Sequence, residues 1–261
     1  MTAADEVPAG SVPESPSGKG REPGVWKFIG TSLWGLALFG AMFAGQFTVV
    51  VWFLVTNGDA VGSSRIVAML SNGRIISLSV IMGLPAILVV LWIATRLSRT
   101  PFADYLALRW PSWKTAAVGA AALVGLMVVW EIISRVAGRE SSPGFMMEVL
   151  RTARADGALW LLVIAFCVVA PITEEFFARG FLYRGWSESF LRPAGAIMLS
   201  AAVWTMMHLQ YNWFFLGQIF SIGLLFGYLR YVSGSTWLTV VLHGLNNLAA
   251  TVQTIWLANN S

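Results

Sequence analysis

The stretch FCVVAPITEEFFARGFLYRG, residues 166–185, is apolar enough to cross a membrane, yet it carries two adjacent glutamates and an arginine. Each charge at the centre of a membrane helix costs about 2.5–3.5 kcal/mol, so these three side chains need partners or a function. Glu175 and Arg179 are four residues apart with the acid first, the favourable order for an ion pair on one helix face. Glu174 is rotated about 100° away with Ala178 at its i+4 position, so it is predicted to point into a polar cavity.

Pro171 interrupts the same stretch, because it has no backbone N–H to donate. A kink or a new helix start is therefore predicted at this position, with Thr173 as the N-cap residue. The two glutamates would then lie in the first turn of the new helix, where the helix dipole favours anions.

The composition is that of a membrane protein. Of 261 residues, 57% are hydrophobic and 11% charged, whereas a soluble domain carries about 25% charged residues. The net charge of +4 comes from basic residues scattered between apolar runs, so we expect no nucleic-acid partner. The single cysteine, Cys167, excludes an intramolecular disulfide framework.

Seven apolar runs predict an all-α, polytopic transmembrane helical bundle with about seven to eight spans. They are residues 26–56, 74–96, 115–137, 157–178, 194–209, 212–231 and 236–257. Residues 1–24 are rich in Pro, Gly, Ser and charge, and they are predicted to form a disordered tail before a transmembrane domain at 25–261. Most Lys and Arg residues fall on the side of this tail, which favours a cytoplasmic N-terminus.

Both histidines of the chain lie in apolar runs, in WTMMH at 204–208 and HGLNN at 243–247. His243 and Asn247 share a helix face, Gly244 permits close helix approach, and Asn246 is expected to be rotated away. Taken singly, His208 is explained as a hydrogen-bonded packing residue and Asn247 as a bond between helices. Taken with the glutamates, they can supply a base, a proton shuttle and oxyanion donors for acyl hydrolysis.

The three segments EEFFAR (174–179), WTMMH (204–208) and HGLNN (243–247) resemble, in this order, the CPBP family of CAAX proteases and bacteriocin-processing or Abi-type intramembrane proteases. The resemblance covers residues 157–257, with Trp204 where the family more often has Phe. It implies an intramembrane endopeptidase whose catalytic core is this segment. By position, Glu174 and His208 would activate water, His243 and Asn247 would stabilise the oxyanion, and Glu175 with Arg179 would hold the site together.

The resemblance also implies a peptide or membrane-protein substrate within the lipid bilayer. No cofactor is required by these residues, because a water activated by Glu174 and His208 alone is chemically sufficient in a desolvated cavity. Zinc remains an open alternative, with Glu174, His208 and His243 as its ligands, although no HExxH motif occurs. Two other functions stay open: a non-catalytic membrane immunity or scaffold protein, and a proton-coupled transporter, against which the lack of an internal repeat counts. A composition rich in Ala, Gly and Arg favours a bacterial plasma membrane.

Overall fold

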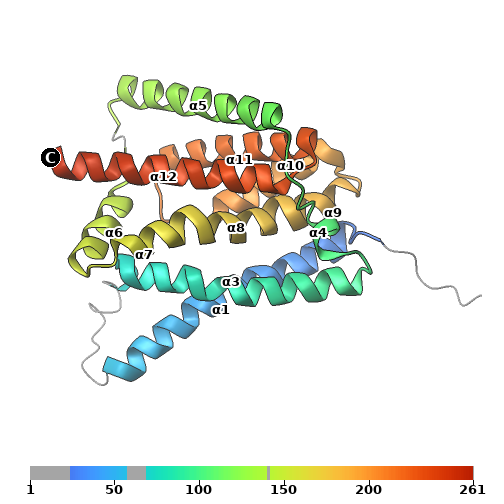
Figure 1. Ribbon diagram of the computed structural model, residues 1–261, viewed down its shortest axis with the longest axis horizontal. Helices are drawn as coiled ribbons and strands as arrows, with labels where there is room; N and C mark the ends of the chain where they lie inside the picture. The colour runs from blue at the N-terminus through green and yellow to red at the C-terminus, as the bar shows by residue number, and fades with distance from the viewer. Residues whose placement is uncertain (1–23, 58–68, 140–141, 261) are drawn as a thin grey trace, which may run out of the picture.

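The computed structural model describes residues 24–57, 69–139 and 142–260, and these residues form helices with no strand among them (Figure 1). The predicted all-α fold is therefore confirmed. The predicted tail lies outside the described residues except for Gly24. The helices are α1 (Phe28–Asn57), α3 (Gly73–Leu97), α4 (Phe102–Tyr105), α5 (Trp113–Val136), α6 (Gly144–Ala155), α7 (Leu159–Ile164), α8 (Ala170–Glu175), α9 (Tyr183–Ser187), α10 (Arg192–Met206), α11 (Trp213–Ser233) and α12 (Thr236–Asn260), with π-helical η2 (Ala165–Val169) and η3 (Phe176–Leu182).

The long helices coincide with the seven predicted apolar runs. In the described part of the chain, five helices are long and apolar enough to cross a membrane: Phe28–Thr56, Gly73–Leu97, Trp113–Val136, Leu159–Ser187 and Trp213–Ser233. Helix α10 has only 15 residues. Helix α12 has 25 residues, but it carries the polar residues of the third motif. The chain is thus a multi-pass membrane protein, and the predicted count of seven to eight spans is not confirmed.

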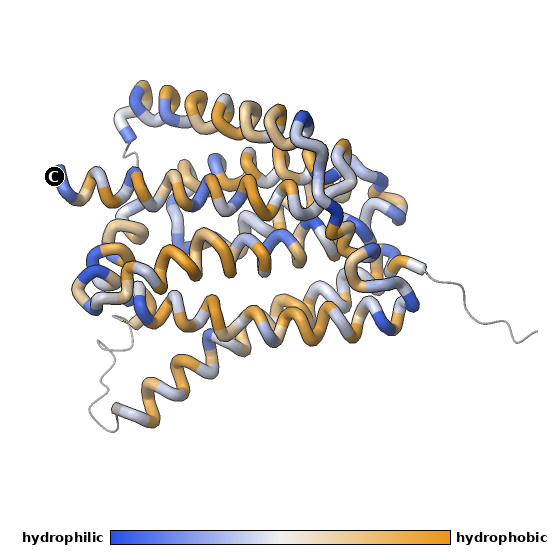
Figure 2. Tube along the Cα trace, in the orientation of Figure 1, coloured by the Kyte–Doolittle hydropathy of each residue, from blue (hydrophilic) through white to orange (hydrophobic). Residues whose placement is uncertain are grey.

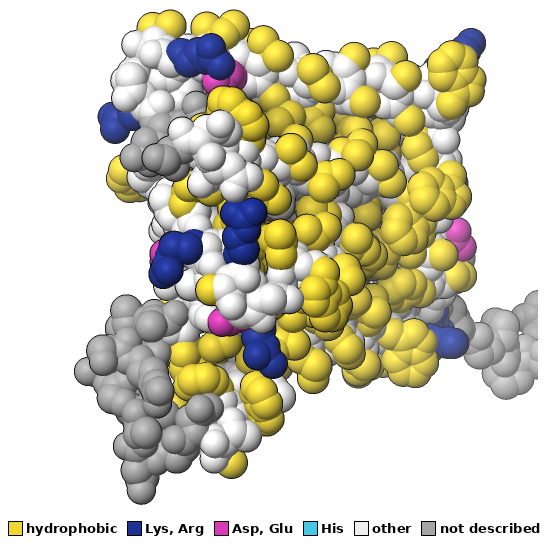
Figure 3. All heavy atoms as spheres, turned by 60° about the vertical axis from the view of Figure 1, so that its left-hand side comes forward, with side chains coloured by type: hydrophobic (Ala, Val, Ile, Leu, Met, Phe, Trp, Pro, Cys, Tyr) yellow, Lys and Arg dark blue, Asp and Glu magenta, His cyan; other side chains and the backbone are white. Residues whose placement is uncertain are grey.

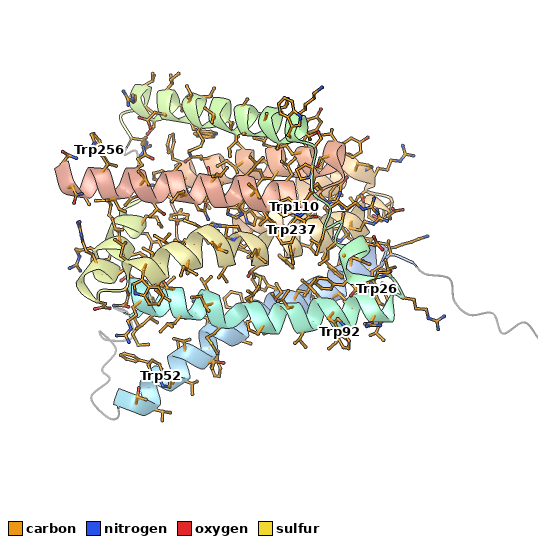
Figure 4. The ribbon with its side chains drawn as sticks, in the orientation of Figure 1. Trp26, Trp52, Trp92, Trp110, Trp237 and Trp256 are labelled. Atoms are coloured by element: carbon orange, nitrogen blue, oxygen red, sulfur yellow. The ribbon has the colours of Figure 1, made fainter. Side chains whose placement is uncertain are left out.

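The surface is that of a protein surrounded by lipid. Hydrophilic positions concentrate toward the two ends of the bundle (Figure 2), and apolar side chains cover the middle of the face in Figure 3. Tryptophans lie toward both ends, with Trp26, Trp110 and Trp237 at one and Trp52 and Trp256 at the other (Figure 4). Tryptophan favours the membrane–water interface, so the helix axes run along the membrane normal.

The helix from residue 159 to 187 runs through the centre of the bundle. It is the most buried of the five candidate spans. Of the predicted kink or new helix start at Pro171, the new start is wrong: the chain stays helical through the proline, and the π-helical segment η2 lies just before it. Thr173 is not an N-cap, because its hydroxyl donates to the carbonyl of Val169 (2.8 Å).

The most buried part of this central helix is η3, in which every side chain is buried. Helices α1, α10, α11 and α12 pack against it, and Phe177, Phe181 and Leu182 lie in the main core cluster. The EEFFAR motif overlaps the start of η3. Its charged side chains therefore face neighbouring helices and not lipid.

Candidate active site

Glu174 lies at the meeting point of the three motifs. Its Oε2 accepts a hydrogen bond from Nε1 of Trp204 (2.6 Å), and it lies 3.9 Å from Nε2 of His208 and 4.0 Å from Nε2 of His243. Helices α8, α10 and α12 thus bring together side chains that are far apart in the sequence. Only 15% of the Glu174 side chain is exposed.

The second nitrogen of each imidazole has a defined partner. Nδ1 of His208 lies 2.9 Å from the carbonyl oxygen of Trp204, and Nδ1 of His243 lies 3.0 Å from Oε1 of Glu175. A carbonyl or a carboxylate oxygen only accepts, so both Nδ1 atoms carry a hydrogen. In the neutral rings, both Nε2 atoms are then free acceptors that face Glu174.

Glu175 and Arg179 form the predicted ion pair. Nη1 of Arg179 donates to Oε1 of Glu175 (2.9 Å), and neither side chain is exposed. Arg179 also donates from Nη2 to the carbonyl of Gly223 (3.0 Å), and its guanidinium lies 4.6 Å from the centre of a Trp204 ring. Because Glu175 also holds His243, this pair both neutralises a buried charge and orients an imidazole.

Asn247 bonds to a carbonyl that Pro171 leaves without a partner. In η2 the hydrogen bonds span five residues, as in Ala170 N–H to Ala165 O. The next donor in that register would be residue 171, which is a proline and has no N–H. Nδ2 of Asn247 donates to the carbonyl of Phe166 instead (2.8 Å). The amide therefore has a structural role, and one of its two N–H groups stays uncommitted.

Gly244 lets α12 approach the central helix closely. A Cβ atom at this position would lie 2.6 Å from the carbonyl oxygen of Cys167 in η2. Any larger residue would push the two backbones apart. This close approach, predicted from the sequence, sets the depth at which His243 and Asn247 meet the central helix.

Asn246 is not rotated away from the site, contrary to the sequence prediction. Its Nδ2 donates to Oδ1 of Asn247 (3.3 Å), and both amides line the same cavity. The sequence also gave no sign that Trp204 donates to Glu174, since an aromatic residue in an apolar run is normally a packing residue. Tyr211 was missed as well: it stacks on His208 with ring centres 6.1 Å apart, and burial raises its pKa to about 12, which keeps its hydroxyl protonated.

These residues line a cavity of about 660 Å³ that extends from Glu174 along α12 to Thr254. Its other walls come from α1, α3, α6 and α11 and from Met127 of α5, through apolar side chains and neutral amides and hydroxyls. Among the described lining residues, Glu174 is the only Asp, Glu, Lys or Arg. The cavity therefore suits an uncharged stretch of polypeptide.

The arrangement does not fit a zinc ion as the side chains stand. Ligand atoms around a tetrahedral zinc lie about 3.4 Å apart, whereas the two Nε2 atoms lie 3.9 and 4.0 Å from Oε2 of Glu174. That oxygen also already accepts from Trp204. In the part of the chain that the structure describes, no three His, Cys, Asp or Glu residues are placed to hold a metal ion.

The fold and the site together define a class: a polytopic membrane protein with a glutamate and two histidines at a buried cavity. Residues 156–249 match the family described as type II CAAX prenyl endopeptidase Rce1-like. All three motifs fall within the matched segment, and the predicted resemblance to the CAAX proteases of the CPBP family is confirmed. The match supports a protease-type hydrolase. Searches of curated proteins and of solved structures found no match.

Proposed function

We propose that this chain is an intramembrane endopeptidase that hydrolyses a peptide bond with a water molecule activated by Glu174 and His208. The observation that carries the proposal is the approach of two imidazole Nε2 atoms to one carboxylate oxygen, at 3.9 and 4.0 Å. Atoms this far apart are bridged by a water about 2.8 Å from each. Oε2 of Glu174 and Nε2 of neutral His208 both accept, so a water between them donates its two hydrogens to this pair and is oriented to lose a proton.

The reaction then needs two proton transfers. The water oxygen attacks the carbonyl carbon of the substrate as its proton passes to Glu174 or His208. The tetrahedral intermediate collapses when the same pair delivers a proton to the leaving amide nitrogen and the C–N bond breaks. The position of Glu174 at a largely apolar cavity shields these transfers from bulk water.

Asn247 and His243 are the proposed oxyanion donors. Asn247 has one uncommitted N–H after its bond to Phe166. His243 can carry a second proton on Nε2, because Glu175 accepts from its Nδ1 and Arg179 neutralises Glu175. With His243 protonated, the charges of the two glutamates, Arg179 and His243 sum to zero. A neutral buried cluster is less costly than a charged one.

The proposed reaction uses no metal, and chelation tests this point. Purified protein reconstituted in vesicles is expected to keep its peptidase activity after prolonged treatment with a chelator and to contain no stoichiometric zinc by elemental analysis. One zinc per chain, lost together with activity in His208→Ala, would instead identify a metallopeptidase.

The function itself is tested by comparing the terminal peptides of membrane proteins from cells with wild-type protein and with Glu174→Gln. The host is a bacterium with the protein in its plasma membrane, the location that the composition favours. We expect cleavage products that disappear in Glu174→Gln. The matched control is Glu131→Gln, because Glu131 is a glutamate of α5 that pairs with Arg135 (2.7 Å) away from the cavity.

The two alternative functions give different outcomes. An immunity or scaffold protein would leave the terminal peptides unchanged and keep its effect in Glu174→Gln. A transporter would show proton-coupled uptake in vesicles without any hydrolysis.

A further inference from the structure

Arg230 is a buried cation without an acidic partner among the residues that the structure describes. It lies in the last turn of α11 and is 5% exposed. Its Nε donates to the hydroxyl of Thr236 (3.1 Å), and its guanidinium lies 5.4 Å from the centre of the Tyr183 ring. Among the described residues, no carboxylate pairs with it and its two Nη atoms make no hydrogen bond. Its four Nη–H groups therefore have no protein acceptor among the described residues.

Two more arginines lie close enough to repel this charge: Arg184 of α9 and Arg109 of the turn after α4. Arg184 has a buried Nε without a hydrogen bond, and its Nη1 is 3.6 Å from Glu188. Arg109 lies 3.5 Å from Asp104, and both side chains are largely exposed. Glu188 and Asp104 are both at least half exposed, and neither bonds to the buried Nε of Arg184, so three cations, Arg230 included, gather here with only two peripheral acids.

Two hydrogen bonds of Thr236 explain why the three arginines lie close together. The hydroxyl of Thr236 donates to the carbonyl of Leu106 (2.5 Å), and its backbone N–H donates to the carbonyl of Ala107 (3.0 Å). The start of α12 is thereby fixed to the turn that carries Arg109. Only two residues separate the end of α11 from the start of α12, so Arg230 in the last turn of α11 lies near this turn as well.

The helix dipole accounts for only part of this arrangement. A cation in the last turn of a helix such as α11 is favourable, because the C-terminal end carries partial negative charge. That effect offsets the charge of Arg230, but it gives no acceptor to its N–H groups, and it does not explain why Arg109 and Arg184 are held nearby.

The cluster lies toward one end of the bundle, where lipid headgroups are expected. Trp110 and Trp237 follow Arg109 and Thr236 in the chain, and their rings stack with centres 5.5 Å apart. Figure 4 shows both tryptophans toward the end of the bundle where α1 begins. Tryptophans mark the membrane interface, and phosphate groups of lipids lie at that level.

We infer that Arg230, Arg184 and Arg109 form a binding site for the phosphate group of an anionic lipid. The planar guanidinium groups present paired N–H donors that match phosphate oxygens. Tyr183 forms the apolar floor under Arg230, and the lipid chains extend along the outer surface of the bundle. The site is distinct from the cavity at Glu174 and does not depend on the proposed peptidase activity.

The test is thermal unfolding of the full chain in detergent with added phosphatidylglycerol, phosphatidylcholine or inorganic phosphate. For the wild type we expect phosphatidylglycerol to raise the unfolding temperature by about 3–6 °C, as binding to the folded state at about tenfold excess over Kd would do. Phosphatidylcholine should raise it by less than about 1 °C, because its choline group repels the arginines.

Variants identify the site. Arg230→Gln should lose the rise, and Arg135→Gln, an arginine at the opposite end of the bundle, should keep it. If Arg230→Gln does not fold, Arg109→Gln and Arg184→Gln carry the test with a partial loss, since their side chains are partly exposed. A rise that persists in all three variants, or a wild type that responds equally to both lipids, would overturn the inference. If inorganic phosphate raised the unfolding temperature equally and only when Arg230 is present, the phosphate site would be supported and its ligand would be a soluble phosphate and not a lipid.

Discussion

Glu174 and Glu175 are neighbours with opposite surroundings, and we predict opposite effects of the same substitution. Glu174→Gln should lower turnover by about 10² to 10⁴, because the proposed base is removed. It should leave the fold intact, since the amide oxygen can still accept from Trp204. Glu175→Gln should lower the free energy of unfolding by about 3–5 kcal/mol, because it leaves the buried Arg179 unpaired.

Peptidase assays and thermal unfolding of the two variants separate these effects. Glu131→Gln serves as the control for both, because its partner Arg135 is largely exposed. Normal proteolysis by purified Glu174→Gln would contradict the assignment of the base. Wild-type stability of Glu175→Gln would contradict the role of the ion pair.

Asn247 has two proposed roles, and Pro171 allows them to be separated. Asn247→Ala should lower turnover by about 10² to 10³ through loss of an oxyanion donor, and it should also destabilise the fold by leaving the carbonyl of Phe166 unpaired. Pro171→Ala restores a backbone N–H for that carbonyl. The double variant should therefore regain stability but not turnover, as measured by unfolding and by kcat.

Asn260→Ala is the control for this series, because Asn260 lies on the same helix, also donates to a backbone carbonyl (Trp256, 2.7 Å) and is exposed. Asn246→Ala is unsuitable, since Asn246 bonds to Asn247. If the double variant regained full turnover, the amide of Asn247 would be structural only.

At the scale of helices, the site depends on the approach of α12 to the central helix. Gly244→Ala should push α12 away from η2, because the new Cβ would lie 2.6 Å from a backbone oxygen that cannot move independently. We expect a loss of stability of about 1–3 kcal/mol and a larger relative loss of turnover, since His243 and Asn247 flank this position. Unfolding and kcat measure the two effects.

Gly125→Ala in α5 is the matched control. Outside the backbone of its own helix, no atom of the described residues lies within 4 Å of a Cβ built at Gly125, so alanine there should be neutral or slightly stabilising. Equal behaviour of the two glycine variants would show that the close approach is not needed.

For the whole molecule, the chain should cross the membrane with its two ends on opposite sides. Helix α1 begins at one end of the bundle, and α12 finishes at the other (Figure 1). Among the described residues, the end where α1 begins carries more basic side chains: Lys27, Arg96, Arg99, Arg109, Lys114, Arg184, Arg192 and Arg230, against Arg74, Arg135, Arg139, Arg151 and Arg154. This excess predicts a cytoplasmic location for that end.

Single cysteines test this orientation in a Cys167→Ala background. An impermeant maleimide should label Arg154→Cys in intact cells and Lys114→Cys only after permeabilisation. The reverse pattern would contradict the orientation, and labelling of both from one side would contradict the crossing of the membrane.

The amino-acid sequence by itself determined the helical membrane class, the Glu175–Arg179 pair, the close approach at Gly244 and the resemblance to the CAAX protease family. Each of these follows from local properties: the length of an apolar run, the i,i+4 spacing on a helix, the lack of a side chain, and the order of three short motifs. The five helices that are long and apolar enough to cross the membrane all coincide with predicted apolar runs.

Only the tertiary structure decided how those residues meet. It placed Oε2 of Glu174 against Trp204, His208 and His243, kept the helix continuous through Pro171 and turned Asn246 toward Asn247. It also left Arg230 without an acid in the described part of the chain. These features are contacts between helices far apart in the chain. The physical reason is that a hydrogen-bonding group in the membrane must find its partner in a neighbouring helix, and spacing within one helix does not say which neighbour supplies it.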